Sequence, residues 1–195
     1  MKVFKLDSMR WLAFGIVVAL VAIAFTVGIL LFTYDSGGTG GNGGNGSQSI
    51  ATDTDLAGSE APNWNLLMSD GGILELNSLR GSFVVVNLMQ TGECVPCQQQ
   101  TSHLKDLYAD HEGRLEILSL SLVLSDTVAR VAQYKEQNGI QWQVGLDTQG
   151  VFGSYFNARS VPTLIIIDDE GFFRWAHVGV WFPDSIEAIL SHLDK

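Results

Sequence analysis

The sequence predicts an α/β domain with a mixed central sheet flanked by helices, preceded by an apolar N-terminal segment. Short apolar, β-branched runs alternate with helical patterns over residues 59–195. The last two apolar runs are joined by a tight turn and followed by an amphipathic helix, which adds antiparallel strands to a parallel set. A charge-free stretch near the N-terminus is separated from this domain by a glycine-rich tract.

The N-terminal region predicts a membrane anchor. Residues 1–10 form the expected cytoplasmic end and residues 11–34 the signal-anchor. Within it, Trp11–Phe32 has no charged residue, and at about 1.5 Å per residue this helix would span the hydrocarbon core of a bilayer. Basic residues precede the apolar run, so we expect the rest of the chain outside the cytoplasm. A cleaved signal peptide is the alternative, although its apolar region would usually be shorter.

Residues 35–58 are predicted to be a flexible linker. Ser36–Ser47 contains seven glycines, and such a composition buries too little apolar surface to order itself. As a flexible coil the linker would reach roughly 27 Å. The domain at 59–195 carries 17 acidic and 8 basic residues, a net charge of 8 − 17 = −9. This acidic balance argues against nucleic acid or anionic lipid as the main partner.

The first half of the domain predicts a hairpin, a strand, a helix and a second strand. Two apolar runs, Trp64–Leu67 and Ile73–Leu76, flank an Asp-Gly-Gly turn sequence, which indicates a hairpin. Phe83–Leu88 is an apolar, β-branched run typical of a buried strand. A helical pattern follows from Cys94 to about residue 110, and Leu115–Leu122 reads as the next strand.

The second half continues the alternation of helices and strands. One predicted helix is stopped by an Asn-Gly pair, and the final strands are joined by an Asp-Asp-Glu-Gly turn. The expected elements are a helix at Asp126–Gln137, a strand at Gln141–Leu146, a short helix at Gly150–Asn157, strands at Thr163–Ile167 and Phe172–Val178, and a helix at Pro183–Leu193.

The chain has two cysteines, Cys94 and Cys97, placed where a strand turns into a helix. Pro96 suits the first helical turn, because its missing N–H would be unpaired there anyway. Free N–H groups and the positive end of the helix dipole stabilise a thiolate at this position, so the pKa of Cys94 should fall. We expect Cys94 to be exposed and to attack a partner disulfide, and the more buried Cys97 to resolve the mixed disulfide.

Other uses of the cysteine pair fit the sequence less well. A zinc site needs four ligands, and no histidine stands at ligand spacing from the pair. Haem attachment would need histidine after Cys97, where Gln98 stands. A purely structural disulfide closing so short a loop would stabilise little. The sequence therefore predicts redox chemistry, with no metal and no cofactor.

A second motif, Ser160-Val161-Pro162-Thr163, enters an apolar strand. Together with the Cys-x-Pro-Cys sequence after a buried strand, and the Asp-x-x-Gly turn after the later strand, it resembles the thioredoxin superfamily. Residues 61–195 as a whole resemble its membrane-anchored TlpA/ResA-type subgroup. The resemblance implies a thioredoxin-like fold with an N-terminal hairpin extension and a central strand–helix insertion.

The resemblance also implies roles for individual residues. Cys94 and Cys97 correspond to the redox-active disulfide, as attacking and resolving cysteine. Glu93, Val95 and Pro96 shape the motif around them. Pro162 matches the family's cis-proline beside the cysteines, and the backbone of Val161 would pair with a bound substrate peptide.

The chain departs from the family pattern at three positions. Glu93 stands where the family usually has tryptophan, and its charge opposes thiolate formation on Cys94. Asn87 replaces the buried acid of thioredoxin, and Gln100 replaces a carboxylate found in some relatives. The redox direction therefore stays open at this point.

The leading hypothesis is an extracytoplasmic thiol–disulfide oxidoreductase. It would act on disulfides of exported proteins, for example in cytochrome or metal-centre maturation, and would need a membrane electron donor. A peroxiredoxin-like thiol peroxidase is the runner-up, since Thr91 and Cys94 match half of Pro-x-x-x-Thr-x-x-Cys, with Asn87 at the proline position. A non-catalytic binding domain is the third possibility.

Overall fold

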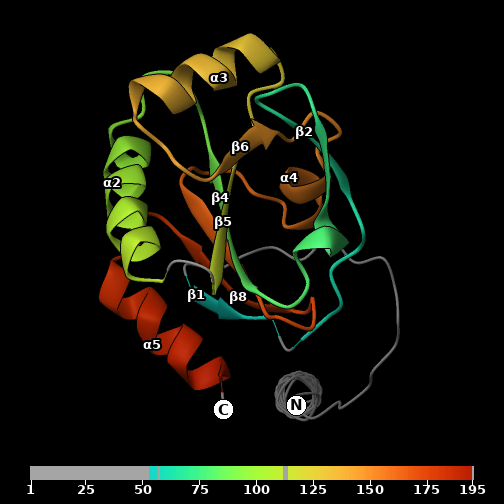
Figure 1. The fold of residues 1–195 in the computed structure, drawn as a ribbon, viewed down its shortest axis with the longest axis vertical. Helices are drawn as coiled ribbons and strands as arrows, with labels where there is room; N and C mark the ends of the chain where they lie inside the picture. Colours follow the sequence, from blue (N-terminus) through green and yellow to red (C-terminus); the bar gives the residue numbers. More distant parts are fainter. Residues whose placement is uncertain (1–52, 57, 112–113, 195) are drawn as a thin grey trace, which may run out of the picture. The chain divides into compact units, whose positions relative to one another are not determined.

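The protein is described from a computed structural model that covers residues 53–56, 58–111 and 114–194. Its strands are β1 (Asp53–Asp55), β2 (Asn65–Met68), β3 (Ile73–Glu75), β4 (Phe83–Met89), β5 (Leu115–Ser121), β6 (Gln143–Leu146), β7 (Thr163–Ile167) and β8 (Phe173–Val178). Its helices are η1 (Leu76–Leu79), α2 (Val95–Asp110), α3 (Val128–Gln137), α4 (Val151–Tyr155) and α5 (Pro183–Leu193). Figure 1 shows how these elements surround the central strands.

The strands form one mixed sheet in the order β1-β8-β7-β4-β5-β6-β2-β3. Strand β4 lies inside it, parallel to β5 and antiparallel to β7. Strands β5 and β6 are parallel, whereas β7 and β8 are antiparallel. Consequently β4, β5, β6 and β8 all end, and β7 begins, at one edge. We call it the cysteine edge, because Cys94 follows β4 there.

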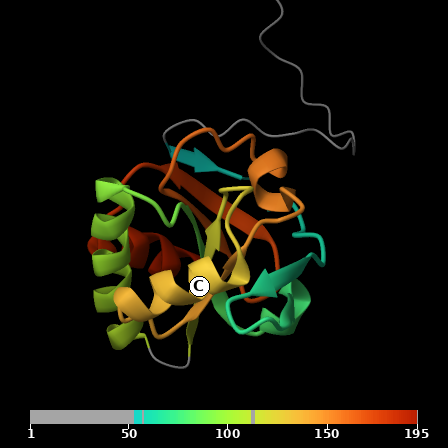
Figure 2. The same ribbon diagram turned by 90° about the horizontal axis from the view of Figure 1, so that it is seen from above.

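Each face of the sheet has its own apolar cluster. One cluster joins the sheet to α2, α3 and α5 through Leu107, Val131 and Ile186. The other joins the opposite face to α4 through Phe152 and Phe156, which pack near Phe173 of β8. In Figures 1 and 2, α2 and α4 accordingly lie on opposite sides of the central strands. The residues of β4 alternate between the two clusters, as expected for a strand buried on both faces.

Local side-chain contacts set the beginnings of two helices. Thr127 is the N-cap of α3, where its hydroxyl accepts a hydrogen bond from the Arg130 N–H at 3.2 Å. The buried carboxylate of Asp147 accepts from the N–H groups of Phe152 and Gly153 in the first turn of α4, at 3.2 and 2.8 Å. In each case an otherwise unpaired N–H group at a helix start is satisfied.

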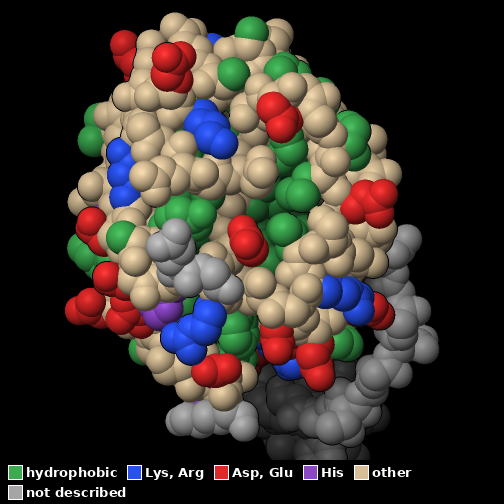
Figure 3. All heavy atoms as spheres, viewed as in Figure 1, with side chains coloured by type: hydrophobic (Ala, Val, Ile, Leu, Met, Phe, Trp, Pro, Cys, Tyr) green, Lys and Arg blue, Asp and Glu red, His purple; other side chains and the backbone are tan. Residues whose placement is uncertain are grey.

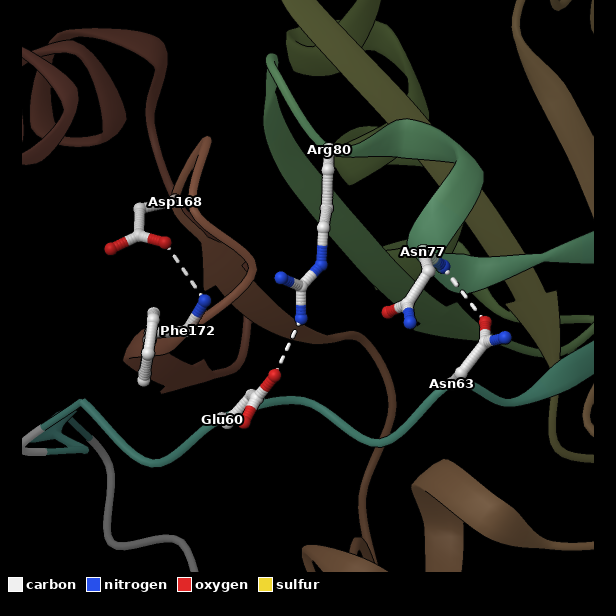
Figure 4. Close-up of polar contacts among 6 residues, drawn as sticks. All are labelled: Glu60, Asn63, Asn77, Arg80, Asp168 and Phe172. Atoms are coloured by element: carbon white, nitrogen blue, oxygen red, sulfur yellow. Dashed lines mark hydrogen bonds and ion pairs between the residues drawn. The ribbon is translucent and has the colours of Figure 1, made fainter.

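Polar contacts attach the segment before β2 to the rest of the domain (Figure 4). The guanidinium of Arg80 lies 2.6 Å from a carboxylate oxygen of Glu60. The N–H of Asn77 donates to the side chain of Asn63 at 3.0 Å. The neighbouring turn between β7 and β8 is held by its own bond, from the N–H of Phe172 to the Asp168 carboxylate at 2.8 Å. On the face shown in Figure 3, Asp and Glu side chains are scattered, with Lys and Arg side chains among them.

The expected elements are present, with small shifts at their ends. Helix α5 has the predicted bounds, whereas α3 starts at Val128 rather than at Asp126. Asp126 instead accepts side-chain hydrogen bonds in the preceding loop. Strand β1 is not among the predicted elements, because Asp53–Asp55 lie within the predicted linker; they pair with β8, with Asp53 opposite His177.

The N-terminal predictions fall outside the described residues. These include the anchor at 11–34 and most of the linker at 35–58. Within 53–56, 58–111 and 114–194, no helix combines the length and the apolar character needed to cross a membrane.

We expect Leu107→Ala to destabilise the domain strongly. The Leu107 side chain is fully buried between α2 and the sheet, so its truncation should lower the free energy of unfolding by about 2–5 kcal/mol. Urea denaturation followed by circular dichroism measures this. Gln99→Ala, on the exposed side of the same helix, serves as the control and should change stability by less than about 0.5 kcal/mol. Equal effects of the two substitutions would contradict the assigned packing.

Candidate active site

The two cysteines are joined where β4 passes into α2. Cys94 and Cys97 form a disulfide with a Cα–Cα distance of 5.2 Å. Cys94 is the N-cap of α2, and its sulfur accepts a hydrogen bond from the Cys97 N–H at 3.1 Å. Pro96 lies in the first turn of the helix, as its missing N–H allows. The N–H of Cys97 is therefore aimed at the sulfur expected to carry the attacking charge.

The disulfide is shielded, whereas the residues around it face solvent. Cys97 is fully buried and Cys94 is only 7% exposed. The expectation that Cys94 is exposed is therefore wrong for the disulfide-bonded protein, in which both sulfurs pack in the apolar cluster between the sheet and α2. Glu93 and Pro96 are exposed, and Val95 is 75% exposed. Because Glu93 is exposed, water screens the effect of its charge on the neighbouring sulfur.

The second predicted motif lies at the same edge of the sheet. The Val161–Pro162 peptide bond is cis, as the resemblance implied. Thr163 follows at the start of β7 and pairs in register with Leu88, near the end of β4. The N–H of Gly179, just after β8, donates to the carbonyl of Pro162 at 2.9 Å. Strand pairing thus brings Pro162 to the edge that carries Cys94, although the two residues are 68 positions apart in the sequence.

Gln100 connects the cysteine helix to the loop after β8. Its side-chain oxygen accepts from the Trp181 N–H at 2.6 Å, and its side-chain nitrogen donates to the Trp181 carbonyl at 3.2 Å. Gln100 is fully buried, and the Trp181 ring packs in the same apolar cluster as Cys97. The His103 ring nitrogen also lies 3.3 Å from the Trp181 carbonyl. A neutral amide at this position satisfies both backbone groups of Trp181, which a carboxylate cannot do.

A second set of polar contacts fixes the loop between β4 and Cys94. The hydroxyl of Thr91 donates to the Asp126 carboxylate at 2.8 Å, and the hydroxyl of Ser121 donates to the same oxygen at 2.6 Å. The Arg130 guanidinium donates to the Thr91 hydroxyl at 3.4 Å. The loop that leads to Cys94 is thereby joined to the loop between β5 and α3.

Asn87 lies in β4, seven positions before Cys94. It is fully buried in β4, and its side-chain nitrogen donates to the Ser119 hydroxyl at 3.2 Å. The indole N–H of Trp142 donates to the same hydroxyl at 3.0 Å. Asn87 and Gln100 are therefore both fully buried neutral amides.

The sequence did not reveal two of these contacts. It identified Gln100 only as a departure from the family pattern, and its partner Trp181 lies 81 positions away. Asp126 was expected inside a helix, and its partner Thr91 is 35 positions away. The helical spacing of Gln100 from Cys97 does place both on the buried side of α2, which is the one signal available from the sequence.

A cavity of about 220 Å³ lies away from the disulfide. Its lining includes Phe83 and Leu115 at the starts of β4 and β5, together with Leu190 of α5. It therefore opens at the edge opposite the cysteines, and we assign it no part in their chemistry.

The fold and the site together define a thioredoxin-superfamily protein with a Cys-x-Pro-Cys disulfide at a helix start. The chain belongs to the AhpC/TSA family, whose model matches residues 57–176. Within the superfamily it is of the TlpA/ResA-like kind. The predicted enzyme class, thiol–disulfide oxidoreductase, is confirmed.

Individual relatives agree with this assignment. A thiol–disulfide oxidoreductase ResA from Bacillus thuringiensis is 28% identical over 138 residues, covering 70% of this chain and 78% of the relative. The thioredoxin-like protein YneN of Bacillus subtilis is 24% identical over 131 residues, covering 67% of this chain and 76% of the relative.

Solved structures support the fold. A DsbF homologue from Corynebacterium diphtheriae superposes with a TM-score of 0.65 at 13% identity, covering 75% of this chain and 99% of the other. StoA from Bacillus subtilis gives a TM-score of 0.54 at 15% identity, covering 64% of this chain and 93% of the other.

We expect Gln100→Glu to weaken the attachment of the loop after β8. A carboxylate can still accept from the Trp181 N–H, but it cannot donate to the Trp181 carbonyl. Losing that bond inside the protein should lower the free energy of unfolding by about 1–3 kcal/mol at neutral pH. Urea denaturation gives the stability. Gln99→Glu makes the same chemical change at an exposed neighbouring position, and equal effects of the two substitutions would rule out this role for Gln100.

Proposed function

We propose that this chain is a membrane-tethered, extracytoplasmic oxidoreductase that reduces disulfides of exported proteins. The observation that carries the proposal is the Cys94–Cys97 disulfide at the start of α2, at the same sheet edge as the cis Val161–Pro162 bond. The ResA relatives, named as thiol–disulfide oxidoreductases, support it. Maturation of cytochromes or metal centres is the kind of process in which such a reductase would act.

The reaction proceeds in two successive thiol–disulfide exchanges. In the reduced protein the Cys94 thiolate attacks one sulfur of the substrate disulfide, forming a mixed disulfide and releasing the other substrate sulfur as a thiolate. Cys97 then loses its proton and attacks Cys94. The Cys94–Cys97 bond forms, and the second substrate sulfur leaves. The substrate gains two electrons, which come from the dithiol of this chain, and its thiolates take up protons.

Three features of the site serve these steps. The Cys97 N–H, 3.1 Å from the Cys94 sulfur, favours negative charge on that sulfur. The resolving Cys97 is fully buried, so the substrate reaches Cys94 first. The backbone of Val161, beside the cis bond, is placed at the cysteine edge, where strand-like pairing would hold a substrate segment. Glu93, Val95 and Pro96 border the attacking sulfur.

Turnover requires a source of electrons. The disulfide left on the chain must be reduced again, and an extracytoplasmic domain cannot draw directly on cytosolic thiols. A membrane electron donor is therefore the expected partner, with the apolar segment at 11–34 keeping the domain at the membrane surface. In this proposal the chain consists of a cytoplasmic end at 1–10, a membrane anchor at 11–34, a linker from residue 35 that ends before β1, and the catalytic domain.

The peroxidase alternative receives less support. Its motif would use the Thr91 hydroxyl beside the reactive cysteine. In the structure this hydroxyl donates to Asp126, and Cys94 is bonded to Cys97 three residues away. Rapid consumption of hydrogen peroxide by the reduced protein would reverse this preference.

We expect Cys94→Ser to abolish reduction of a protein disulfide such as that of insulin, because no attacking thiolate remains. Cys97→Ser should instead accumulate a mixed disulfide with the substrate, since the resolving step is lost. Turbidity of reduced insulin measures the first outcome, and non-reducing electrophoresis with mass spectrometry measures the second. Full activity of Cys94→Ser would disprove the proposed mechanism.

We expect the full-length chain to stay with membranes after a wash at alkaline pH and to be released by detergent, because the apolar run spans a bilayer. Deletion of residues 2–34 should move it to the soluble fraction. In intact cells, a membrane-impermeant maleimide should label the reduced cysteines if the domain lies outside the cytoplasm. Cys94→Ser, which leaves the anchor unchanged, should partition like the native chain. Release of the native chain by the alkaline wash would contradict the anchor.

A further inference from the structure

One carboxylate joins the two loops that leave the centre of the sheet at the cysteine edge. Met89 and Ser121, the last residues of β4 and β5, pair in register. The Leu122 N–H also donates to the Met89 carbonyl at 3.0 Å, so the two loops start side by side. A single oxygen of Asp126 then accepts hydrogen bonds from the hydroxyls of Thr91 and Ser121, at 2.8 and 2.6 Å. Asp126 therefore connects the end of β5 to the loop that leads to the attacking cysteine.

Both hydroxyls that donate to Asp126 are buried. Ser121 is 1% exposed and Thr91 is 9% exposed, so neither can readily turn to water instead. Each hydroxyl also accepts a hydrogen bond, Ser121 from the Val123 N–H at 3.3 Å and Thr91 from the Arg130 guanidinium at 3.4 Å. Because a buried hydroxyl that loses its acceptor is costly, these bonds hold the Thr91 side chain, and the loop that carries it, in one position.

The loop fixed in this way is short. Only two residues lie between Thr91 and Cys94. The side chain of Gln90 donates to the Glu93 carbonyl at 3.2 Å, which closes the loop on itself. Cys94 then begins α2, with its sulfur bonded to that of Cys97. The contact between Thr91 and Asp126 therefore restrains Cys94 in the geometry of the disulfide.

We propose that Asp126 is a positioning residue that favours the disulfide-bonded form of the Cys94–Cys97 couple and so makes this chain a stronger reductant. The inference rests on the proposed function and gives its redox direction a structural cause. Two cysteines held in bonding geometry form their disulfide at a high effective concentration. When the bond is reduced, a loop without Asp126 would gain conformational freedom, which favours the dithiol. By holding the loop, Asp126 removes much of that gain.

The charge of Asp126 is the alternative cause, since a negative charge opposes a thiolate on Cys94. Two substitutions separate the alternatives. Asparagine keeps a side-chain oxygen that can accept from both hydroxyls, but it carries no charge. Alanine removes the acceptor and the charge together. If the hydrogen bonds matter, Asp126→Asn should resemble the native chain; if the charge matters, it should resemble Asp126→Ala.

The test measures the equilibrium of the full-length chain, in mild detergent, with dithiothreitol buffers at neutral pH. The protein disulfide takes two electrons and two protons from the dithiol, which closes to its cyclic disulfide. The reduced fraction is trapped with a maleimide and measured by mass spectrometry. The variants are Asp126→Ala, Asp126→Asn, Thr91→Val and Thr91→Ser. The matched control, Asp184→Ala, removes an exposed carboxylate from the first turn of α5, which follows β8.

Asp126→Ala and Thr91→Val should each shift the equilibrium constant about tenfold toward the dithiol, the size expected for one lost hydrogen bond to a charged group. This corresponds to a reduction potential about 30 mV less negative. The double variant should shift no further than Asp126→Ala, because both substitutions remove the same contact. Asp126→Asn and Thr91→Ser keep that contact, and they should stay within about twofold of the native chain, as should Asp184→Ala.

A merely structural role for Asp126 predicts a different result. It would lower the stability of the oxidised and the reduced protein equally, which leaves the equilibrium between them unchanged. An unchanged equilibrium constant in Asp126→Ala and Thr91→Val would therefore overturn the inference, as would equal shifts in Asp126→Ala and Asp126→Asn. Should Asp126→Ala fail to fold, Thr91→Val decides the question alone, because it leaves the bond between Ser121 and Asp126 in place.

The proposed function is tested separately on the native chain. Failure of the reduced native chain to reduce insulin would count against that function. A tenfold shift in Asp126→Ala and Thr91→Val would in that case still assign Asp126 its role in the equilibrium of the cysteine couple.

Discussion

The site depends on the position of β4 between a parallel and an antiparallel neighbour. Because β4 and β5 are parallel, their C-terminal ends, and the loops that follow them, lie at the same edge of the sheet. Its antiparallel pairing with β7 brings the start of β7 to the same edge, with Leu88 opposite Thr163. Cys94 and Pro162 come together for this reason, and a shift of one residue in this pairing would turn the side chains of β7 to the wrong face.

Neutral groups surround the buried side of the disulfide, and charged groups stay outside. Gln100 and Asn87 are fully buried amides. Gln100 is hydrogen-bonded to the backbone of Trp181, and Asn87 to the hydroxyl of Ser119. Glu93 is exposed beside the attacking sulfur. An ionised group in the buried positions would be expensive without a partner. The buried amides of Gln100 and Asn87 instead form hydrogen bonds within the protein and carry no charge.

Two hydrogen-bonded connections relate the reactive helix to its neighbours. Asp126 joins the loop after β5 to the loop before Cys94, and Gln100 joins α2 to the loop after β8. Both connections therefore fix loops that follow strands ending at the cysteine edge.

The sequence by itself determined the elements and the reactive pair. Apolar periodicity placed β4 and α5 closely, and a cysteine between a buried strand and a helix start already indicated a nucleophile, because these signals are local. Only the tertiary structure decided the rest. Strand β1 has three polar residues and is defined by its pairing with β8. The partner of Gln100 lies 81 positions away. Such contacts depend on strand order and register, which set distances between residues that no local pattern relates.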